Sequence, residues 1–173
     1  QKEKFRKMND TNLEKIRYDN EATSILKSGN NNLIGAKSID LVHRDCYLFY
    51  ENLLNKNITK NSSVLEIACG YGRHSHIPIS KSSDYTGIDI STKSIQLARD
   101  LYPGYKFIKG NFIDYDFKNK FDIIICAGSL SYFDFDIFFD KIESISNKKT
   151  KIILVDSLND NFFYSFKRYV DYK

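Results

Sequence analysis

The stretch VLEIACGYGRH occupies residues 64–74, and YTGIDIS follows it at residues 85–91. In the first stretch an apolar strand reaches Glu66 and then bends through Gly70 and Gly72. The second stretch reads as another apolar strand, and it ends on Asp89. Two acids at the ends of two strands, with a glycine turn beside the first, predict an edge of a sheet that binds a nucleoside.

The composition indicates one soluble domain. The chain has 173 residues, of which 42% are hydrophobic and 28% charged, enough to bury a core. The net charge of +4 comes from basic and acidic residues that are interspersed along the chain. Nucleic-acid-binding arms carry blocks of like charge, so no nucleic-acid partner is expected. No apolar run approaches the roughly 20 residues of a membrane span.

The cysteines favour a reducing compartment. Cys46, Cys69 and Cys126 are odd in number, far apart, and lack the spacing of a metal site. We therefore expect neither a disulfide framework nor a bound metal, and a cytoplasmic location. No signal peptide is visible, and the chain opens on Gln rather than Met, so we expect the first residues to have been removed.

Hydrophobic periodicity predicts helices first and then an alternation of strands and helices. Residues 2–27 predict one or two amphipathic helices, and residues 38–55 a well-packed helix. Strands are expected at 63–68, 84–89, 105–109, 121–126 and 151–156, with helices at about 72–80, 91–102, 135–147 and 160–171. Ser91 is the expected N-cap of its helix. Near-continuous Ile and Val runs in the strands indicate an α/β fold: a doubly wound, mostly parallel sheet with helices on both faces.

The unusual residues fall at the ends of these strands, where such sheets bind ligands. Gly70 and Gly72 let the backbone lie against a ligand, with the next helix facing an anionic group. Asp89 can accept hydrogen bonds from both hydroxyls of a ribose. Asn111 offers an amide to an adenine amino group, and the ring or backbone of Phe112 lies beside it. Small residues come after the fourth strand, namely Ala127, Gly128 and Ser129.

Two other nucleotide motifs fit less well. The nicotinamide fingerprint G-x-G-x-x-G lacks its third glycine, because Arg73, His74 and Ser75 come after Gly72. Glu66 has no role in that fingerprint, and the Walker pattern is absent. A nicotinamide-dependent enzyme with a degraded fingerprint nevertheless stays open as an alternative.

The segment EIACGYG resembles the first motif, E/D-x-G-x-G-x-G, of the class I S-adenosylmethionine-dependent methyltransferases, with Ala68 in place of the first glycine. The resemblance covers about residues 60–157. It implies S-adenosyl-L-methionine as cofactor and S-adenosyl-L-homocysteine as product. It also implies that the cofactor-binding residues are Glu66, Ala68, Gly70, Gly72 and Arg73 at the methionine part, Asp89 at the ribose, Ile90, Asn111 and Phe112 at the adenine, and Ala127 and Ser129 at the sulfonium end.

The family has a seven-stranded core, whereas this sequence supplies five strands and a helix. The resemblance therefore implies that the final strands are absent and that residues 58–173 form a C-terminally incomplete Rossmann-like core. Residues 1–57 would form a helical lid over the cofactor, in which Tyr18, His43 and Tyr47 could contact substrate. The C-terminal stretch is also similar to methyltransferases of bacterial surface-polysaccharide gene clusters.

The residues after the fourth strand narrow the class of acceptor. The sequence there is GSLS, which lacks the proline-containing patch of methyltransferases that act on DNA bases. We therefore expect a small-molecule or saccharide acceptor that is methylated on oxygen or nitrogen. The catalytic base is unassigned, with Tyr132 and His43 as candidates; His74 and His76, just after the glycine turn, are further histidines near the site. A non-catalytic S-adenosylmethionine-binding partner subunit is the remaining alternative, and we expect a monomer or homodimer.

Overall fold

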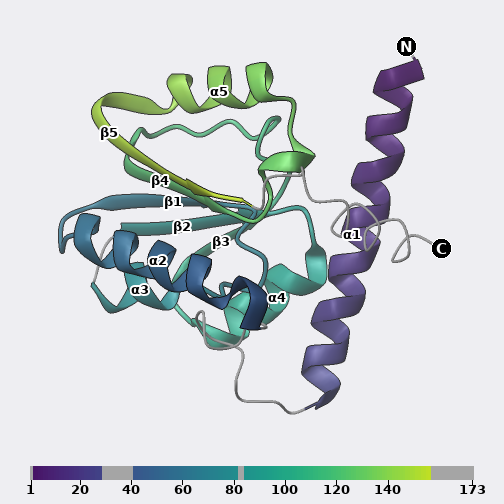
Figure 1. The fold of residues 1–173 in the computed structure, drawn as a ribbon, viewed down its shortest axis with the longest axis horizontal. Coiled ribbons are helices and arrows are strands. Elements are labelled where there is room, and N and C mark those ends of the chain that lie inside the picture. Colours follow the sequence, from purple (N-terminus) through teal and green to yellow (C-terminus); the bar gives the residue numbers. More distant parts are fainter. Residues whose placement is uncertain (1, 29–40, 82–83, 157–173) are drawn as a thin grey trace.

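The chain forms one five-stranded parallel sheet with helices on both faces (Figure 1). The computed structural model describes residues 2–28, 41–81 and 84–156. The strands are β1 (Ser63–Ile67), β2 (Asp84–Asp89), β3 (Lys106–Lys109), β4 (Phe121–Ala127) and β5 (Ser146–Val155), in the order β3-β2-β1-β4-β5. Chain order reverses between β1 and β4, which confirms the expected doubly wound sheet. The final strands of the seven-stranded family core are not among these described residues.

The core is divided between the two faces of the sheet, because successive strand residues point to opposite faces. On one face, Val64 and Ile125 pack in a buried cluster with Leu54 of α2 (Leu41–Asn57). On the other, Leu65 and Phe138 share a second cluster, Phe138 coming from α5 (Phe135–Ser144). The apolar strand runs are therefore explained by helices that cover both faces.

The helix that comes after the glycine turn is shorter than the sequence predicts. The prediction of a helix at about 72–80 is wrong at its start, because α3 spans His76–Ser80 and residues 71–75 form turns. Gly72 has a φ of 82°, which is incompatible with a helix. Ser75 stands at the N-cap position but makes no side-chain cap bond there. A five-residue helix therefore presents no extended N-terminus to an anion.

The boundary between α5 and β5 also differs from the prediction. The helix expected to reach residue 147 ends at Ser144, and β5 begins at Ser146 instead of residue 151. The Phe121 N–H donates to the Ile145 carbonyl at 3.0 Å, which starts the pairing of the two strands earlier. Thr150 Oγ1 then donates to the Phe121 carbonyl across a register shift. The helix expected at 160–171 lies outside the described residues.

The helix α1 (Lys2–Ser28) is a single helix that stands beside the core and contacts α4 (Thr92–Leu101). Ser91 caps α4 as predicted, accepting a hydrogen bond from the Ser94 N–H at 3.0 Å. Asp19 of α1 joins this cap, because its Oδ1 accepts from Ser91 Oγ at 2.6 Å and from the Lys93 N–H at 2.9 Å. Burial opposes ionisation of Asp19, but these hydrogen bonds lower its pKa overall. A specific polar contact therefore joins α1 to the core.

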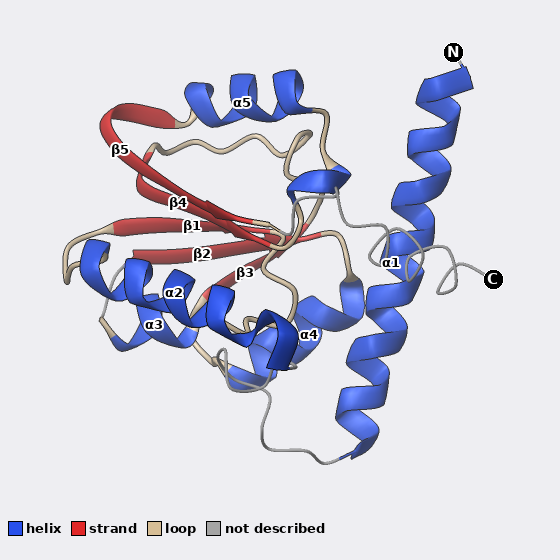
Figure 2. Ribbon diagram, viewed as in Figure 1, coloured by secondary structure: helices blue, strands red, loops and turns tan. Residues whose placement is uncertain are grey.

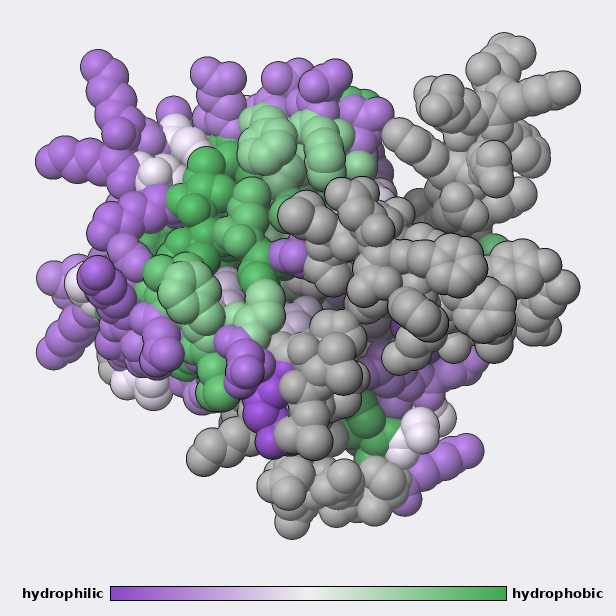
Figure 3. Space-filling model, viewed as in Figure 1, coloured by the Kyte–Doolittle hydropathy of each residue, from purple (hydrophilic) through white to green (hydrophobic). Residues whose placement is uncertain are grey.

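Apolar surface continues from α5 across β5 to α2 (Figure 3). The exposed side chains of these elements include Phe139, Ile152 and Phe49, the last of them 64% exposed. The strand β5 is the last of the sheet on this side, so its outer edge has no neighbouring strand among the described residues.

Candidate functional site

The carboxyl ends of four parallel strands bring the predicted site positions to one edge of the sheet. Figure 2 shows the loops after these strands gathered on the side that faces α1. The Cys69 N–H donates to the Ile88 carbonyl at 3.1 Å, which holds the end of β1 against β2. The Gly110 N–H donates to the Asp89 carbonyl at 2.9 Å, which does the same for β3. The predicted convergence of strand ends is therefore present in the fold.

The loop after β1 contains three left-handed residues in five positions. Ala68 has a φ of 52°, Gly70 of 54° and Gly72 of 82°. Ala68 is the only residue other than glycine with a positive φ in the described ranges. A left-handed conformation costs a residue with a Cβ about 1–2 kcal/mol. The motif that this loop resembles has glycine at this position, and the backbone explains that preference.

Asp89 ties this loop to the start of α4. Its Oδ2 accepts a hydrogen bond from the Gly70 N–H at 2.9 Å, and its Oδ1 accepts from the Ser91 N–H at 2.7 Å. Burial raises the pKa of Asp89 above its ordinary value, while the hydrogen bonds from Ser91 and Gly70 oppose that rise. Carboxylate oxygens have about four lone-pair sites in total, so acceptor capacity remains for the hydroxyls of a ligand. The next residue, Ile90, is partly exposed beside this carboxylate.

Glu66 points into the protein rather than toward the loop's outer surface. It is 3% exposed, and its Oε2 accepts hydrogen bonds from Ser75 Oγ at 2.8 Å and from the Tyr85 hydroxyl at 2.7 Å. Burial raises the pKa of Glu66, whereas the hydrogen bonds from Tyr85 and Ser75, and the proximity of His74, act in the opposite direction. In this arrangement the carboxylate supports the loop from behind.

The two residues after β3, Asn111 and Phe112, have different surroundings. Asn111 is exposed, its Oδ1 accepting from the Ile113 N–H at 3.1 Å and its Nδ2 donating to Asp114 at 2.8 Å. The ring of Phe112 is 3% exposed and packs on Phe138 with ring centroids 5.5 Å apart. The Phe112 ring therefore belongs to the core, and its backbone is what reaches the sheet edge.

The end of β4 lies against α2. The partly exposed Ala127 precedes Gly128, which has a φ of 69°. A Cβ on Gly128 would stand 2.6 Å from the hydroxyl of Tyr47, so α2 approaches this turn closely. Ser129 is buried, and its Oγ is 3.5 Å from the Ala127 carbonyl, to which it donates. The sequence indicated Tyr47 as a lid residue that could contact substrate, and in the structure it directly adjoins Gly128 after β4.

Tyr132, a candidate base, lies in the short 3-10 helix Leu130–Tyr132 after β4. Its side chain is hydrogen-bonded to Tyr18 of α1. Burial, followed by the proximity of Tyr132, raises the pKa of Tyr18 well above its ordinary value. The pair joins α1 to the loop after β4, and a raised pKa makes Tyr18 a poor base at neutral pH.

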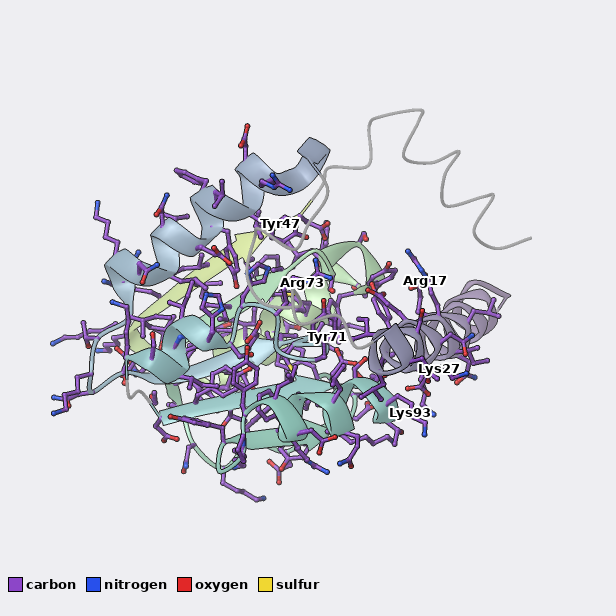
Figure 4. All side chains as sticks on the ribbon, turned by 90° about the horizontal axis from the view of Figure 1, so that it is seen from below. Arg17, Lys27, Tyr47, Tyr71, Arg73 and Lys93 are labelled. Carbon is purple, nitrogen blue, oxygen red and sulfur yellow. The ribbon has the colours of Figure 1, made fainter. Side chains whose placement is uncertain are left out.

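Basic and aromatic side chains lie in and after the glycine loop. Figure 4 shows Tyr47, Arg73 and Tyr71 one below another between α2 and α4. The Arg73 guanidinium lies over the Tyr71 ring, 5.4 Å from its centroid, with Nη2 3.9 Å from Glu21. The guanidinium remains partly exposed, at 27% of the side chain, so it could still meet a carboxylate of a ligand.

The three histidines differ in their surroundings. His74 is buried, stacked on Tyr47 at 5.2 Å between centroids, and its Nδ1 lies 3.0 Å from Glu51 Oε1. His76 lies 3.2 Å from the Arg73 carbonyl, and burial lowers its pKa. The side chain of His43 lies outside the described residues.

Sequence reasoning missed the inner partners of the site, namely Ser75, Tyr85, Tyr102 and Glu51. One signal could have found Tyr85. It stands two positions before Gly87, so both point to the same face of β2 and the glycine leaves room for the ring. The other partners meet the site only through tertiary contacts.

Within the described ranges, no group of three or more His, Cys, Asp or Glu side chains could hold a metal ion. Cys46, Cys69 and Cys126 are all free thiols. None of the described helices combines the length and the apolar character needed to cross a membrane.

The fold and its glycine loop define a Rossmann-like nucleotide-binding class, and comparison with known proteins narrows it. A family model described as a methyltransferase domain matches residues 58–168. The chain therefore belongs to this methyltransferase domain family, whose members are enzymes that use S-adenosylmethionine as cofactor. No protein of curated function matches the sequence.

Solved structures share the fold. The plantazolicin methyltransferase BpumL, crystallised with a pentazolic desmethylPZN analog and SAH, is 21% identical with a TM-score of 0.58; the match covers 70% of this chain and 50% of BpumL. YcgJ of Bacillus subtilis is 18% identical with a TM-score of 0.60, and the match covers 72% of this chain and 58% of YcgJ. PH0226 of Pyrococcus horikoshii is 26% identical with a TM-score of 0.56, and the match covers 66% of this chain and 58% of PH0226. The chain thus spans only 50% to 58% of the length of these proteins.

Proposed function

We propose that this chain binds S-adenosylmethionine at the edge formed by β1 to β4 and takes part in transfer of its methyl group to a small acceptor. One observation carries the proposal: Asp89 ends β2, the strand next to β1, and its Oδ2 accepts a hydrogen bond from the Gly70 N–H in the loop after β1 at 2.9 Å. This supports a role for the Asp89 carboxylate toward ribose hydroxyls, since it lies beside Gly70, where an added Cβ would meet no atom within 4 Å. Family membership supplies the identity of the ligand.

The remaining residues take the roles that the family resemblance assigns, modified by their contacts. Asp89 accepts from the ribose, and Arg73 meets the methionine carboxylate. Glu66 supports the methionine part through the loop, since its Oε2 accepts from Ser75 and Tyr85. The other proposed cofactor-binding positions are Ala68, Gly70, Gly72, Ile90, Asn111, Phe112, Ala127 and Ser129.

The cofactor supplies an activated methyl group, and the protein's part is alignment of an acceptor with that group in a site from which water is excluded. Transfer forms a bond from the acceptor oxygen or nitrogen to the methyl carbon and breaks the bond from carbon to sulfur. The proton of the acceptor passes to a base or to solvent. Tyr132 and His43 stay as candidates for that base.

Residues 1–57 are proposed as the lid over this edge and residues 58–173 as the core. The close approach of Tyr47 to Gly128 and the bond between Tyr18 and Tyr132 support a lid built from both N-terminal helices. We propose a small-molecule or saccharide acceptor, a monomer or homodimer, and a cytoplasmic location. The plantazolicin methyltransferase, crystallised with its desmethylPZN analog, supports a small acceptor.

Calorimetry tests the identity of the cofactor that the chain binds. We expect S-adenosylhomocysteine to bind and NADH not to bind. Asp89→Ala removes a charged acceptor worth about 1.5–3 kcal/mol, so the dissociation constant should rise by about 10- to 150-fold. Tight binding of NADH without S-adenosylhomocysteine would overturn the proposal. Incubation with methyl-labelled donor and a panel of hydroxyl and amine acceptors then distinguishes an enzyme from a binding subunit.

A further inference from the structure

The loop after β1 is supported by a group of four buried side chains. Glu66, Ser75, Tyr85 and Tyr102 form this group, which we call the loop clamp. The hydroxyls of Ser75 and Tyr85 both donate to the same oxygen, Glu66 Oε2, at 2.8 and 2.7 Å. The two hydroxyl oxygens are themselves 2.7 Å apart. Glu66 and Tyr85 come from neighbouring strands, while Ser75 comes after the loop, so the clamp closes the loop onto the sheet.

The fourth member holds the loop from the end of α4. The Tyr102 hydroxyl donates to the Gly72 carbonyl at 3.0 Å. A Cβ on Gly72 would stand 2.9 Å from both Ser75 Oγ and Tyr102 Cε2. Gly72 is therefore required by its contact with the clamp as well as by its φ of 82°. The last glycine of the motif, Gly72, therefore serves the inner side of the loop.

Gly87 has a matching role under Tyr85. A Cβ on Gly87 would stand 2.6 Å from the Tyr85 hydroxyl and 2.9 Å from Cys69 Sγ. The Tyr85 side chain extends forward along β2 over this glycine and reaches Glu66 on β1. Two separate glycines, Gly72 and Gly87, thus leave the room that the buried Glu66 carboxylate and its hydroxyl partners occupy.

We propose that Tyr85 is a positioning residue for donor binding, acting through Glu66 and Ser75 to hold the glycine loop in its ligand-accepting shape. This inference rests on the proposed function. The link to the ligand is the Gly70 N–H, which donates to Asp89 at 2.9 Å, so a displaced loop displaces a partner of the ribose-binding carboxylate. Tyr85 itself is 2% exposed and acts from behind the loop.

The variant Tyr85→Phe removes only the hydroxyl, and Tyr50→Phe is its matched control. Tyr50 is also fully buried, but its hydroxyl has no hydrogen-bond partner within the described part of the chain. We expect Tyr85→Phe to weaken S-adenosylhomocysteine binding about tenfold in calorimetry, as loss of a hydrogen bond to a carboxylate should. Tyr50→Phe should bind as the wild type does. Urea unfolding of each variant gives the folded fraction under the binding conditions.

The pH dependence of S-adenosylhomocysteine binding distinguishes a positioning role of Tyr85 from a purely structural one. The Tyr85 hydroxyl favours the ionised form of Glu66, so its loss should raise the pKa of Glu66 further. The pH at which binding falls off in acid should therefore be higher in Tyr85→Phe than in Tyr50→Phe. The titratable groups that face Glu66 from the surrounding elements are His74, Asp89, Tyr50, Cys69, Cys126, Tyr102 and Tyr85.

The outcomes are distinct. Wild-type protein that fails to bind S-adenosylhomocysteine overturns the proposed function and this inference with it. Wild-type binding with equal affinities for Tyr85→Phe and Tyr50→Phe overturns the inference alone, as does a loss explained entirely by the unfolded fraction. Should Tyr85→Phe fail to fold, Ser75→Ala removes the other donor to Glu66 Oε2 and must show the same weakened binding and the same pH shift.

Discussion

The substitution Gly72→Ala tests whether the second glycine of the loop is required by packing as well as by backbone conformation. The new Cβ would stand 2.9 Å from Ser75 Oγ and from Tyr102 Cε2, on a residue with a φ of 82°. The left-handed backbone alone costs about 1–2 kcal/mol, and overpacking of a filled interior adds about 1–3 kcal/mol. We therefore expect the free energy of unfolding to fall by about 2–5 kcal/mol.

Gly104→Ala is the matched control. Gly104 has a φ of 90°, but a Cβ there would meet no atom within 4 Å. This variant should lose only the backbone contribution, about 1–2 kcal/mol. Both substitutions reduce the conformational entropy of the unfolded chain equally, so the difference between the two variants isolates the contact.

Equilibrium unfolding in urea, followed by circular dichroism at neutral pH, measures both losses. The expected result is a clearly larger loss of stability in Gly72→Ala than in Gly104→Ala. Equal losses would refute the reasoning, because they would mean that the Ser75 and Tyr102 side chains move aside without cost.

Other perturbations test single contacts. Asp19→Ala should cost about 0.5–2 kcal/mol at pH 7, because Ser91 Oγ and the Lys93 N–H at the start of α4 lose their acceptor on α1. The pKa of Asp19 is lowered in the folded protein, so this stability difference, measured by urea unfolding, is lost as the pH falls from the ordinary value of 3.8 through the lowered one. Burial raises the pKa of Glu66, so ionisation of this carboxyl opposes folding. The free energy of unfolding of Glu66→Gln should therefore rise relative to that of the wild type as the pH rises above the ordinary value of 4.5. A stability difference that does not change with pH contradicts this. A thiol reagent should modify the exposed Cys46 in the native protein and reach Cys69 and Cys126 only after unfolding, since burial raises the pKa of both thiols.

Local pattern was sufficient for the strands and for the edge at which the site lies. The run that became β4, FDIIICA, is apolar at nearly every position, which only a sheet covered on both faces accommodates. Ser91 could be recognised as a cap because its partner, the Ser94 N–H, is three residues away. Asp89 could be placed beside the glycine loop because parallel strands end at the same edge.

Long-range contacts could not be predicted in this way. The predicted start of α3 was wrong because Gly72 has a left-handed φ of 82° in a loop that the hydrogen bond from Ser75 Oγ to Glu66 holds against the sheet. Phe112 was expected with its ring or its backbone beside an adenine, yet its ring enters the core where Phe138 provides a buried partner. In each case a side chain 9 or more residues away along the sequence decides the outcome, and spacing does not encode it.

By itself, the sequence determined the alternation of strands and helices, the left-handed glycine loop and the acids at two strand ends, because each depends on neighbours along the chain. Only the tertiary structure decided the direction in which those acids act. Asp89 faces the edge with the Gly70 N–H, while Glu66 turns inward, because the hydroxyls of Tyr85 and Ser75 satisfy a carboxylate that has lost contact with water. That difference depends on which donors the fold brings to each carboxylate.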